Sequence, residues 1–236
     1  MFMKIGSFKY SDKGSRIENQ DTVEALELNG FYIACVADGV GGGNCGKLAS
    51  QTIVDLFISN KYDTNINLTE VIETAHNKIK YLQSVNTDCS GMATTFTGCI
   101  IDGNNLKIVH VGDSRLCILR GNGIQQLTDS HTEAYRLYRA GKIKFEDIKN
   151  YPRRHILESA VGIDENLTIQ SLEFGLLQGD RILLTTDGVH DIISKQEFRD
   201  LSMRSDSVTV YGYEIVSLLK SKKITDNVSF VILSVE

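Results

Sequence analysis

The sequence has little of what marks several large classes of protein. Its 236 residues include a single proline and 20 glycines, without the biased composition of disordered or collagen-like chains. Every apolar run is well short of the ~20 residues that a membrane-spanning helix needs. The N-terminus, which reads MFMKIGSFKYSDKG, has no extended apolar segment of the kind found in signal peptides. We therefore expect a cytoplasmic protein with no membrane association.

An excess of positive charge is also missing. Lysine and arginine number 25 against 30 aspartates and glutamates, which gives a formal net charge of −5. The basic footprint of a nucleic-acid-binding protein is absent, and we expect no nucleic acid partner. A mildly acidic protein can still bind phosphate locally, through one arginine or through metal ions.

The five cysteines form no C-x-x-C pair, and their number is odd. They are Cys35, Cys45, Cys89, Cys99 and Cys117, and several lie inside apolar runs. This pattern is typical of reduced, mostly buried thiols in a cytosolic protein. We expect each to serve as a small core residue and none to act as a nucleophile.

Short β-branched segments are frequent along the chain. They lie roughly at 3–9, 22–28, 31–37, 93–101, 105–111, 115–120, 167–173, 181–186 and 227–234. Turn signals separate several neighbours, which predicts antiparallel pairing. Apolar residues at helical spacing predict helices at 45–59, 68–84, 133–140, 195–202 and 208–221. Either Asn67 or Thr69 would cap the start of the second helix.

This order of elements predicts an α+β fold with antiparallel sheets rather than alternating βαβ units. No repeat, low-complexity tract or linker interrupts the chain. We therefore expect a single domain over residues 1–236. A chain of this length can bury a sizeable core without disulfide bonds or structural metal ions.

Two phosphate-handling signals lie side by side in residues 35–50. Gly41–Lys47 reads G-x-x-x-x-G-K, the core of a nucleotide-binding P-loop. The hydroxyl residue that would hold Mg²⁺ is replaced by Leu48, and the carboxylate of Asp38 precedes the glycines. Nucleotide hydrolysis is therefore the weakest alternative. The glycines are better explained by a tight turn in which the backbone approaches a ligand closely.

Aspartates recur at the ends of the strand-like segments. Each adjoins an apolar, β-rich segment, and the set is Asp21, Asp38, Asp113, Asp187 and Asp226. Taken singly, each is explained as a turn residue or a helix cap. Together, carboxylates at neighbouring strand ends can converge and bind hard cations such as Mg²⁺ or Mn²⁺. Two such ions about 3.5–4 Å apart can share a bridging hydroxide and stabilise an in-line phosphoryl displacement.

Around these aspartates the chain carries a series of short motifs, which are Arg16-x-x-Asn19-Gln20-Asp21, Ala37-Asp38-Gly39, Gly91-Met92-Ala93-Thr94-Thr95, Val109-His110-Val111-Gly112-Asp113-Ser114-Arg115, Leu127-Thr128 with His131, Thr186-Asp187-Gly188 and Asp226-Asn227. Taken in this order, they resemble the motifs of the metal-dependent serine/threonine protein phosphatases of the type 2C family, in the compact bacterial form. The motif around Asp113 is the most specific of them. The resemblance implies a four-layer αββα sandwich, with two central antiparallel sheets flanked by helices and a metal centre at one end.

The resemblance also implies roles for individual residues. Two Mn²⁺ or Mg²⁺ ions, with a third, weaker site, would be held by Asp21, Asp38, Gly39, Asp113, Asp187 and Asp226. Asp38 would bridge the two ions, and Asp113 would serve the third site. Arg16 would clamp the substrate phosphate, because its planar guanidinium matches two phosphate oxygens. Arg16 and Asp38 are thus the implied catalytic residues.

The implied activity is hydrolysis of phosphoserine and phosphothreonine in proteins by a hydroxide that bridges the two ions. Partners would be phosphorylated proteins, including a serine/threonine kinase and its targets, and we expect a monomer. One alternative is a non-catalytic binding module of the same fold, which is disfavoured because Asp38, Asp187 and Asp226 are all present. Another is a phosphatase for a single regulator protein of the anti-sigma-antagonist type.

Two features of the sequence leave its specificity open. Val40 occupies a position where many eukaryotic relatives have histidine, so the proton donor to the leaving group is not identified. The segment after Thr132 should form a flap beside the active site and is rich in arginine and lysine. These charges would bind an acidic partner or simply cover a solvated helix face.

Overall fold

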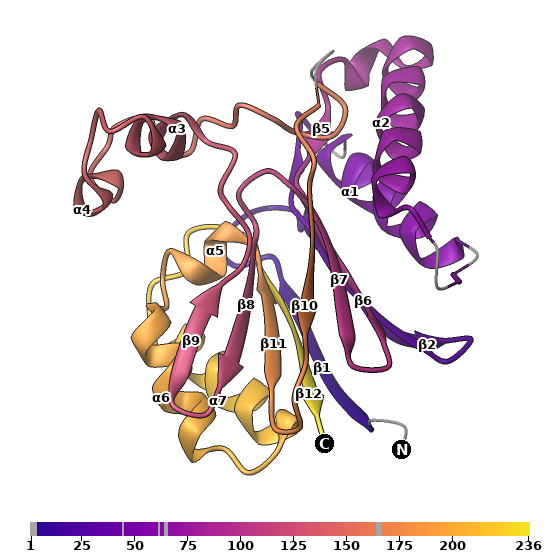
Figure 1. Cartoon of the computed structure of the whole chain (residues 1–236). Coiled ribbons are helices and arrows are strands. Elements are labelled where there is room, and N and C mark those ends of the chain that lie inside the picture. The colour runs from indigo at the N-terminus through magenta and orange to yellow at the C-terminus, as the bar shows by residue number, and fades with distance from the viewer. Residues whose placement is uncertain (1–3, 44, 61, 64–65, 164–166) are drawn as a thin grey trace.

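Two five-stranded antiparallel sheets form the centre of the computed structural model, which describes all residues except 1–3, 44, 61, 64–65 and 164–166. The first sheet has the order β1 (Ile5–Asp12), β12 (Val228–Val235), β11 (Arg181–Thr185), β8 (Arg115–Arg120) and β9 (Gly123–Gln126). The second has the order β10 (Gln170–Gly175), β7 (Asn105–Val111), β6 (Phe96–Asp102), β3 (Phe31–Ala37) and β2 (Thr22–Leu28). Helices cover the outer faces (Figure 1).

The core between the sheets follows from the alternation of side chains along each strand. In β3, Ala34 and Val36 pack toward the other sheet, whereas Ile33 and Cys35 pack toward the helices. The strand β12 is likewise buried on both faces. Strands with two buried faces need apolar residues at nearly every position, which explains their continuous hydrophobic sequences.

Two long helices cover the second sheet, and two others cover the first. The first pair is α1 (Cys45–Ser59) and α2 (Leu68–Val85), and the second is α6 (Lys195–Arg204) and α7 (Val208–Ser221). Each buries an apolar stripe, as α1 does with Ala49, Ile53 and Phe57. This arrangement confirms the predicted α+β, four-layer αββα sandwich.

The remaining elements are short and gather near one end of the sandwich. They are β4 (Gly39–Val40), η1 (Thr87–Cys89), β5 (Ala93–Thr94), α3 (Glu133–Arg139), α4 (Phe145–Ile148) and α5 (Asp187–His190). Figure 1 shows α3 and α4 projecting from the sheets, as expected for a flap.

One predicted strand is divided in two. The segment 93–101 forms β5 and β6, because the backbone between them turns to Asp38 instead of continuing the sheet ladder. There the N–H of Thr95 donates to the carbonyl of Asp38 over 2.9 Å. The sequence analysis did not predict β9, α4 or α5, each of which has only four residues.

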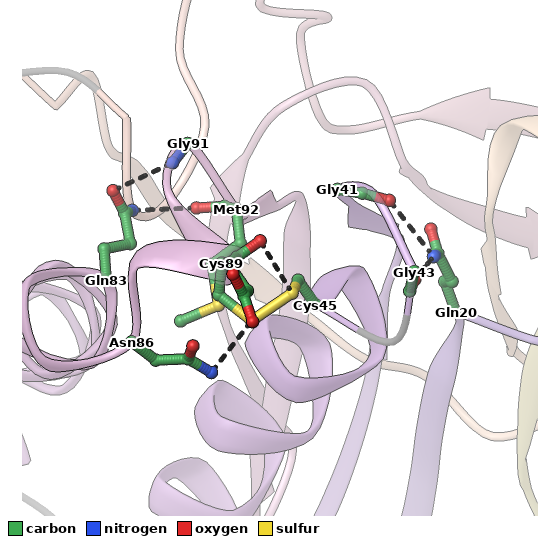
Figure 2. The surroundings of a disulfide bond; sticks show 10 residues. Gln20, Gly41, Gly43, Cys45, Gln83, Asn86, Cys89, Gly91 and Met92 are labelled. Atoms are coloured by element: carbon green, nitrogen blue, oxygen red, sulfur yellow. Dashed lines mark hydrogen bonds between the residues drawn. A yellow bond between two sulfur atoms is a disulfide. The ribbon is translucent and has the colours of Figure 1, made fainter.

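The prediction of five reduced thiols was wrong for two of them. Cys45, the first residue of α1, and Cys89, the last residue of η1, form a disulfide bond with their Cα atoms 5.3 Å apart (Figure 2). Cys35, Cys99 and Cys117 are free and buried, as predicted. The disulfide removes one argument for a cytoplasmic location, which stays a prediction.

The start of α2 offers a test of the local structure. Asn67 is its N-cap, and the side-chain oxygen accepts from the N–H of Thr69 over 3.1 Å. We expect Asn67→Ala to lower the free energy of unfolding by about 1 kcal/mol, because an orphan N–H loses its partner. Asn67→Ser keeps an accepting oxygen without placing a second carboxylate beside Glu70, which accepts from the Asn67 amide, and should retain most of this stability. Urea unfolding followed by circular dichroism measures both, and equal midpoints for Asn67→Ala and the wild type would contradict the assignment.

Candidate metal centre

The predicted aspartates meet where the strands of the two sheets end. Asp38 follows β3, Asp187 follows β11, and Asp113 lies in the turn between β7 and β8. Asp21 and Asp226 come just before β2 and β12. Because the strands are antiparallel, the start of one and the end of its neighbour lie at the same edge, which brings these carboxylates together.

A cavity of about 730 Å³ contains most of the predicted site. Its walls include Arg16, Asp38, Gly39, Asp187 and Asp226. Three aspartates, one glycine and one arginine thus line the same space. Oxygen ligands of this kind suit Mg²⁺ and Mn²⁺.

Asp187 also lines a second cavity of about 120 Å³, together with Asp113 and His155. The ligand atoms of these three residues all lie within 4.8 Å of one another. The Nδ1 of His155 is 3.8 Å from a carboxylate oxygen of Asp187. The sequence analysis did not include His155 among the ligands, because nothing in the flap sequence links this residue to the aspartates.

Asp21 does not line either of these cavities and is 1% exposed. One carboxylate oxygen accepts from the hydroxyl of Thr186 over 2.9 Å. The other, Oδ1, has no hydrogen-bond partner among the described residues. A buried carboxylate oxygen without a partner is costly, and a cation or an ordered water that a cation holds would satisfy it.

Neighbouring segments fix the backbone of Asp38 and Gly39. The N–H of Asp38 donates to the Thr95 hydroxyl over 3.0 Å, and the Thr94 hydroxyl donates to the Asp38 carbonyl over 2.9 Å. Gly39 lies against Gly46 of α1, where a Cβ atom on residue 39 would lie 2.1 Å from the Gly46 carbonyl oxygen. Only glycine fits there, so the backbone of the predicted ligands is tightly confined.

The electrostatics of the cluster favour bound cations. Burial raises the pKa of Asp38 well above its usual range, and the charges of Asp21, Asp187 and Asp113 raise it further. Burial likewise raises the pKa of Asp21 to about 6 and that of Asp113 to about 7. Carboxyls this crowded bind either protons or cations near neutral pH. The residues present therefore fit a divalent metal cluster.

Arg16 contacts one of the predicted ligands directly. Its Nε and Nη2 donate to the two carboxylate oxygens of Asp226 over 2.8 and 2.7 Å. These hydrogen bonds and the charge of Asp226 raise the pKa of Arg16. The side chain is 58% exposed at the cavity wall. Its role as a phosphate clamp stays a prediction.

The geometry argues against the P-loop alternative. The ammonium of Lys47 donates to the Asp21 carbonyl over 2.6 Å and to the Thr22 hydroxyl over 2.8 Å. It is therefore directed to the start of β2. The surrounding sheet is antiparallel, whereas P-loop enzymes use parallel βαβ units.

Comparison with known proteins agrees with this geometry. The family described as protein phosphatase 2C matches residues 10–216. The chain belongs to the protein phosphatase 2C family. A relative of this phosphatase, the serine/threonine phosphatase stp of Listeria welshimeri, is 30% identical over 233 residues, which cover 94% of this chain and 88% of the relative.

Solved structures of other phosphatases share the fold. The S. agalactiae serine/threonine phosphatase has a TM-score of 0.90 and 26% identity, covering 99% of this phosphatase and 100% of that chain. The catalytic domain of PstP, solved in complex with two manganese ions, has a TM-score of 0.86 and 26% identity. The match covers 100% of this chain and 99% of that domain. Within the described residues, no helix of the phosphatase is both long enough and apolar enough to cross a bilayer.

The raised pKa values predict how the stability of the metal-free phosphatase depends on pH. Asp21 and Asp113 have pKa values of about 6 and about 7 in the folded chain, against about 3.9 for an unperturbed aspartate. Between about pH 4 and 7 these two carboxyls thus hold more protons in the folded than in the unfolded chain, so their contribution to stability falls as pH rises. Burial lowers the pKa of His110 and His190, which act in the opposite direction. The measured quantity is therefore a difference between variants: in a chelator, the Tm of Asp21→Asn relative to the wild type should rise across this window.

Added Mn²⁺ serves as the control for this measurement. A divalent cation favours the ionised carboxylates, so Mn²⁺ should raise the Tm more at pH 7.5 than at pH 5. If the Tm in the chelator changed with pH to the same extent in the wild type and Asp21→Asn, the carboxyl of Asp21 would not contribute to the pH dependence of stability.

Proposed function

We propose that this metal-dependent serine/threonine protein phosphatase hydrolyses its substrates at the cavity lined by Arg16 and Asp38, and that it is built as a single domain over residues 1–236. The observation that carries the proposal is the convergence of Asp38, Asp187 and Asp226 on one cavity beside Arg16. Acidic ligands for cations and a guanidinium for a phosphate group are what metal-assisted phosphoryl transfer requires.

The donor set suits two Mn²⁺ or Mg²⁺ ions, with a third, weaker site. Asp38 would bridge the two ions, with the Gly39 carbonyl, Asp187 and Asp226 as further ligands. Asp21 would contact a cation, or a water that a cation holds, through its unpartnered oxygen Oδ1. When bound, such ions lower the pKa of the attacking water and stabilise the charge of an in-line displacement.

The third site would draw on the second cavity. Asp113 and His155 have ligand atoms close to those of Asp187, so one residue would serve both parts of the centre. His155 comes from the flap segment, which would link the position of the flap to this site.

Arg16 would orient the substrate phosphate. Its Nε and Nη2 donate in parallel to the carboxylate of Asp226, and the same planar fork would fit two oxygens of a phosphate. Since Arg16 and Asp38 line the same cavity, a phosphate held by Arg16 lies next to the bridging ligand.

We infer that the partners are phosphorylated proteins, among them a serine/threonine kinase and its targets, and that the phosphatase acts as a monomer. The basic residues of the flap give little guide to these partners, because several are paired. Arg136 contacts Glu158 at 2.6 Å, and Arg153 contacts Glu133 at 2.8 Å. These two arginines of the flap thus form ion pairs with neighbouring glutamates of this chain.

The first experiment tests the bridging ligand. Phosphate release from a phosphothreonine peptide should require Mn²⁺ or Mg²⁺ and stop in a chelator. We expect Asp38→Asn to lower kcat/KM by roughly 100-fold or more, because the shared ligand of both ions is lost.

Asp55→Asn is the matched control, because Asp55 is an exposed aspartate on α1 whose side chain bonds only to Gln51 among the described contacts. It should keep wild-type rates and metal dependence. Normal turnover by Asp38→Asn would exclude Asp38 as the bridging ligand.

The second experiment separates phosphate binding from metal binding. We expect Arg16→Ala to lower kcat/KM by about 10- to 100-fold, because two charge-assisted hydrogen bonds to phosphate are lost. Metal affinity should not weaken, since the substitution removes a cation from beside Asp226. Calorimetric titration with Mn²⁺ measures this directly. A large loss of Mn²⁺ affinity in Arg16→Ala would refute the phosphate-clamp role.

A further inference from the structure

The Cys45–Cys89 disulfide joins the start of α1 to η1 (Figure 2). The residues that follow each cysteine contact the backbone of the predicted metal ligands Asp38 and Gly39. Cys45 opens α1 and follows the glycines that come after Gly39. Cys89 ends η1, four residues before β5 begins at Ala93. Both cysteines are nearly buried, with 8% and 6% of their surface exposed.

The first of these segments is the start of α1. The backbone of Gly46, next to Cys45, lies against Gly39 so closely that no side chain fits between them. The carboxamide of Gln20 holds the connecting turn by donating to the carbonyls of Gly41 and Gly43 over 3.2 and 2.6 Å. A displacement of Cys45 therefore displaces the wall against which Gly39 packs.

The second segment is the one that leads into β5. Gly39 pairs with Thr94 in the small β4–β5 ladder, and both Thr94 and Thr95 bond to the Asp38 backbone. The turn after Cys89 is anchored on α2, because the side chain of Gln83 donates to the Met92 carbonyl over 2.9 Å.

A covalent bond thus closes a ring around the ligand backbone. From Asp38 and Gly39, one side of the ring runs through Gly46 to Cys45, and the other runs through β5 to Cys89. Apart from the bond, the described contacts between the start of α1 and η1 are packing and the approach of the Cys45 sulfur to the Asp88 carbonyl oxygen at 3.6 Å. Metal–ligand distances in well-formed sites lie within about 0.2 Å of standard values, so relaxation of the backbone that carries two ligands would cost metal affinity.

We propose that the Cys45–Cys89 disulfide is a positioning element of the metal centre, so that its reduction by a dithiol weakens binding of divalent metal. This inference rests on the proposed function, because that function makes Asp38 and Gly39 metal ligands. In the reaction, a thiolate of the reductant attacks one sulfur and forms a mixed disulfide with it. The second thiol of the reductant then releases that cysteine, so two electrons and two protons reach Cys45 and Cys89, and the reductant becomes a cyclic disulfide.

The test compares Mn²⁺ binding by the oxidised and reduced protein. The chain is reduced with excess dithiothreitol, and the reductant is removed under anaerobic conditions. Thiol titration in denaturant checks completion, with three thiols expected before reduction and five after it. Calorimetry should give a Kd for Mn²⁺ at least about fivefold higher in the reduced protein, and reoxidation should restore the original value.

Variants separate the disulfide from other effects of the reductant. The double variant Cys45→Ser, Cys89→Ser should bind Mn²⁺ as weakly as the reduced protein, with or without dithiothreitol. Cys117→Ala changes a free, buried cysteine on β8 and should keep the full response to reduction.

Loss of a cross-link also lowers global stability, and this effect needs its own control. Leu201→Ala removes a buried side chain from α6 in the other helical layer. It should lower the Tm while leaving the Kd for Mn²⁺ unchanged. All titrations are run well below the lowest Tm of the set, with near-ultraviolet circular dichroism to show that each protein is folded.

The outcomes distinguish this inference from the proposed function. Tight and equal Mn²⁺ binding by the oxidised, reduced and double-variant proteins would overturn the role of the disulfide and leave the metal centre in place. Weaker binding by Leu201→Ala to the same extent would also overturn it, by showing that stability alone sets affinity. Failure of every form to bind Mn²⁺ would overturn the metal centre, and this inference with it.

Discussion

Repulsion among carboxylates is the constraint that the rest of the structure must meet. Asp21, Asp38, Asp113 and Asp187 each have a pKa raised by burial and by neighbouring acidic groups, so holding them together costs free energy while they are charged. Sheets with an apolar core between them and helices on both outer faces supply the rigidity. The strand ends cannot move apart to reduce the repulsion. The charge of the carboxylates is therefore neutralised by bound cations or by protons.

Close backbone contacts transmit that rigidity to the loops. A Cβ atom on Gly188 would lie 1.9 Å from the carbonyl oxygen of Asn227, so the loop of Asp187 packs directly on the loop of Asp226. The side chain of Asn227 in turn donates to the carbonyls of Lys13 and Glu18 over 3.0 and 2.8 Å. The segment carrying Arg16 is thereby fixed relative to two of the predicted metal ligands.

The sequence predicted most of the features that depend on neighbouring residues and missed some that depend on contacts between distant segments. The strands Thr22–Leu28 and Phe31–Ala37 follow from local apolar and β-branched composition, and their predicted bounds match the structure. The four-residue helix α5 is made by hydrogen bonds around Thr186, too few to leave a periodic signal. The disulfide joins residues 44 positions apart, and His155 reaches Asp187 from the flap. Both depend on how distant segments pack, which composition and spacing do not encode.

The flap shows why a charge-rich sequence says little about its target. Arg154 pairs with Asp191 at 3.2 Å, which joins the flap to the loop after α5. Individual exposed pairs of this kind contribute little to stability, but they occupy the groups that a partner would otherwise meet. At the mouth of the larger cavity, the side chains of Ile17 and Val40 are 92% and 45% exposed. Ile17 and Val40 thus lie beside the charged residues, so a group that contacts Arg16 also meets apolar side chains.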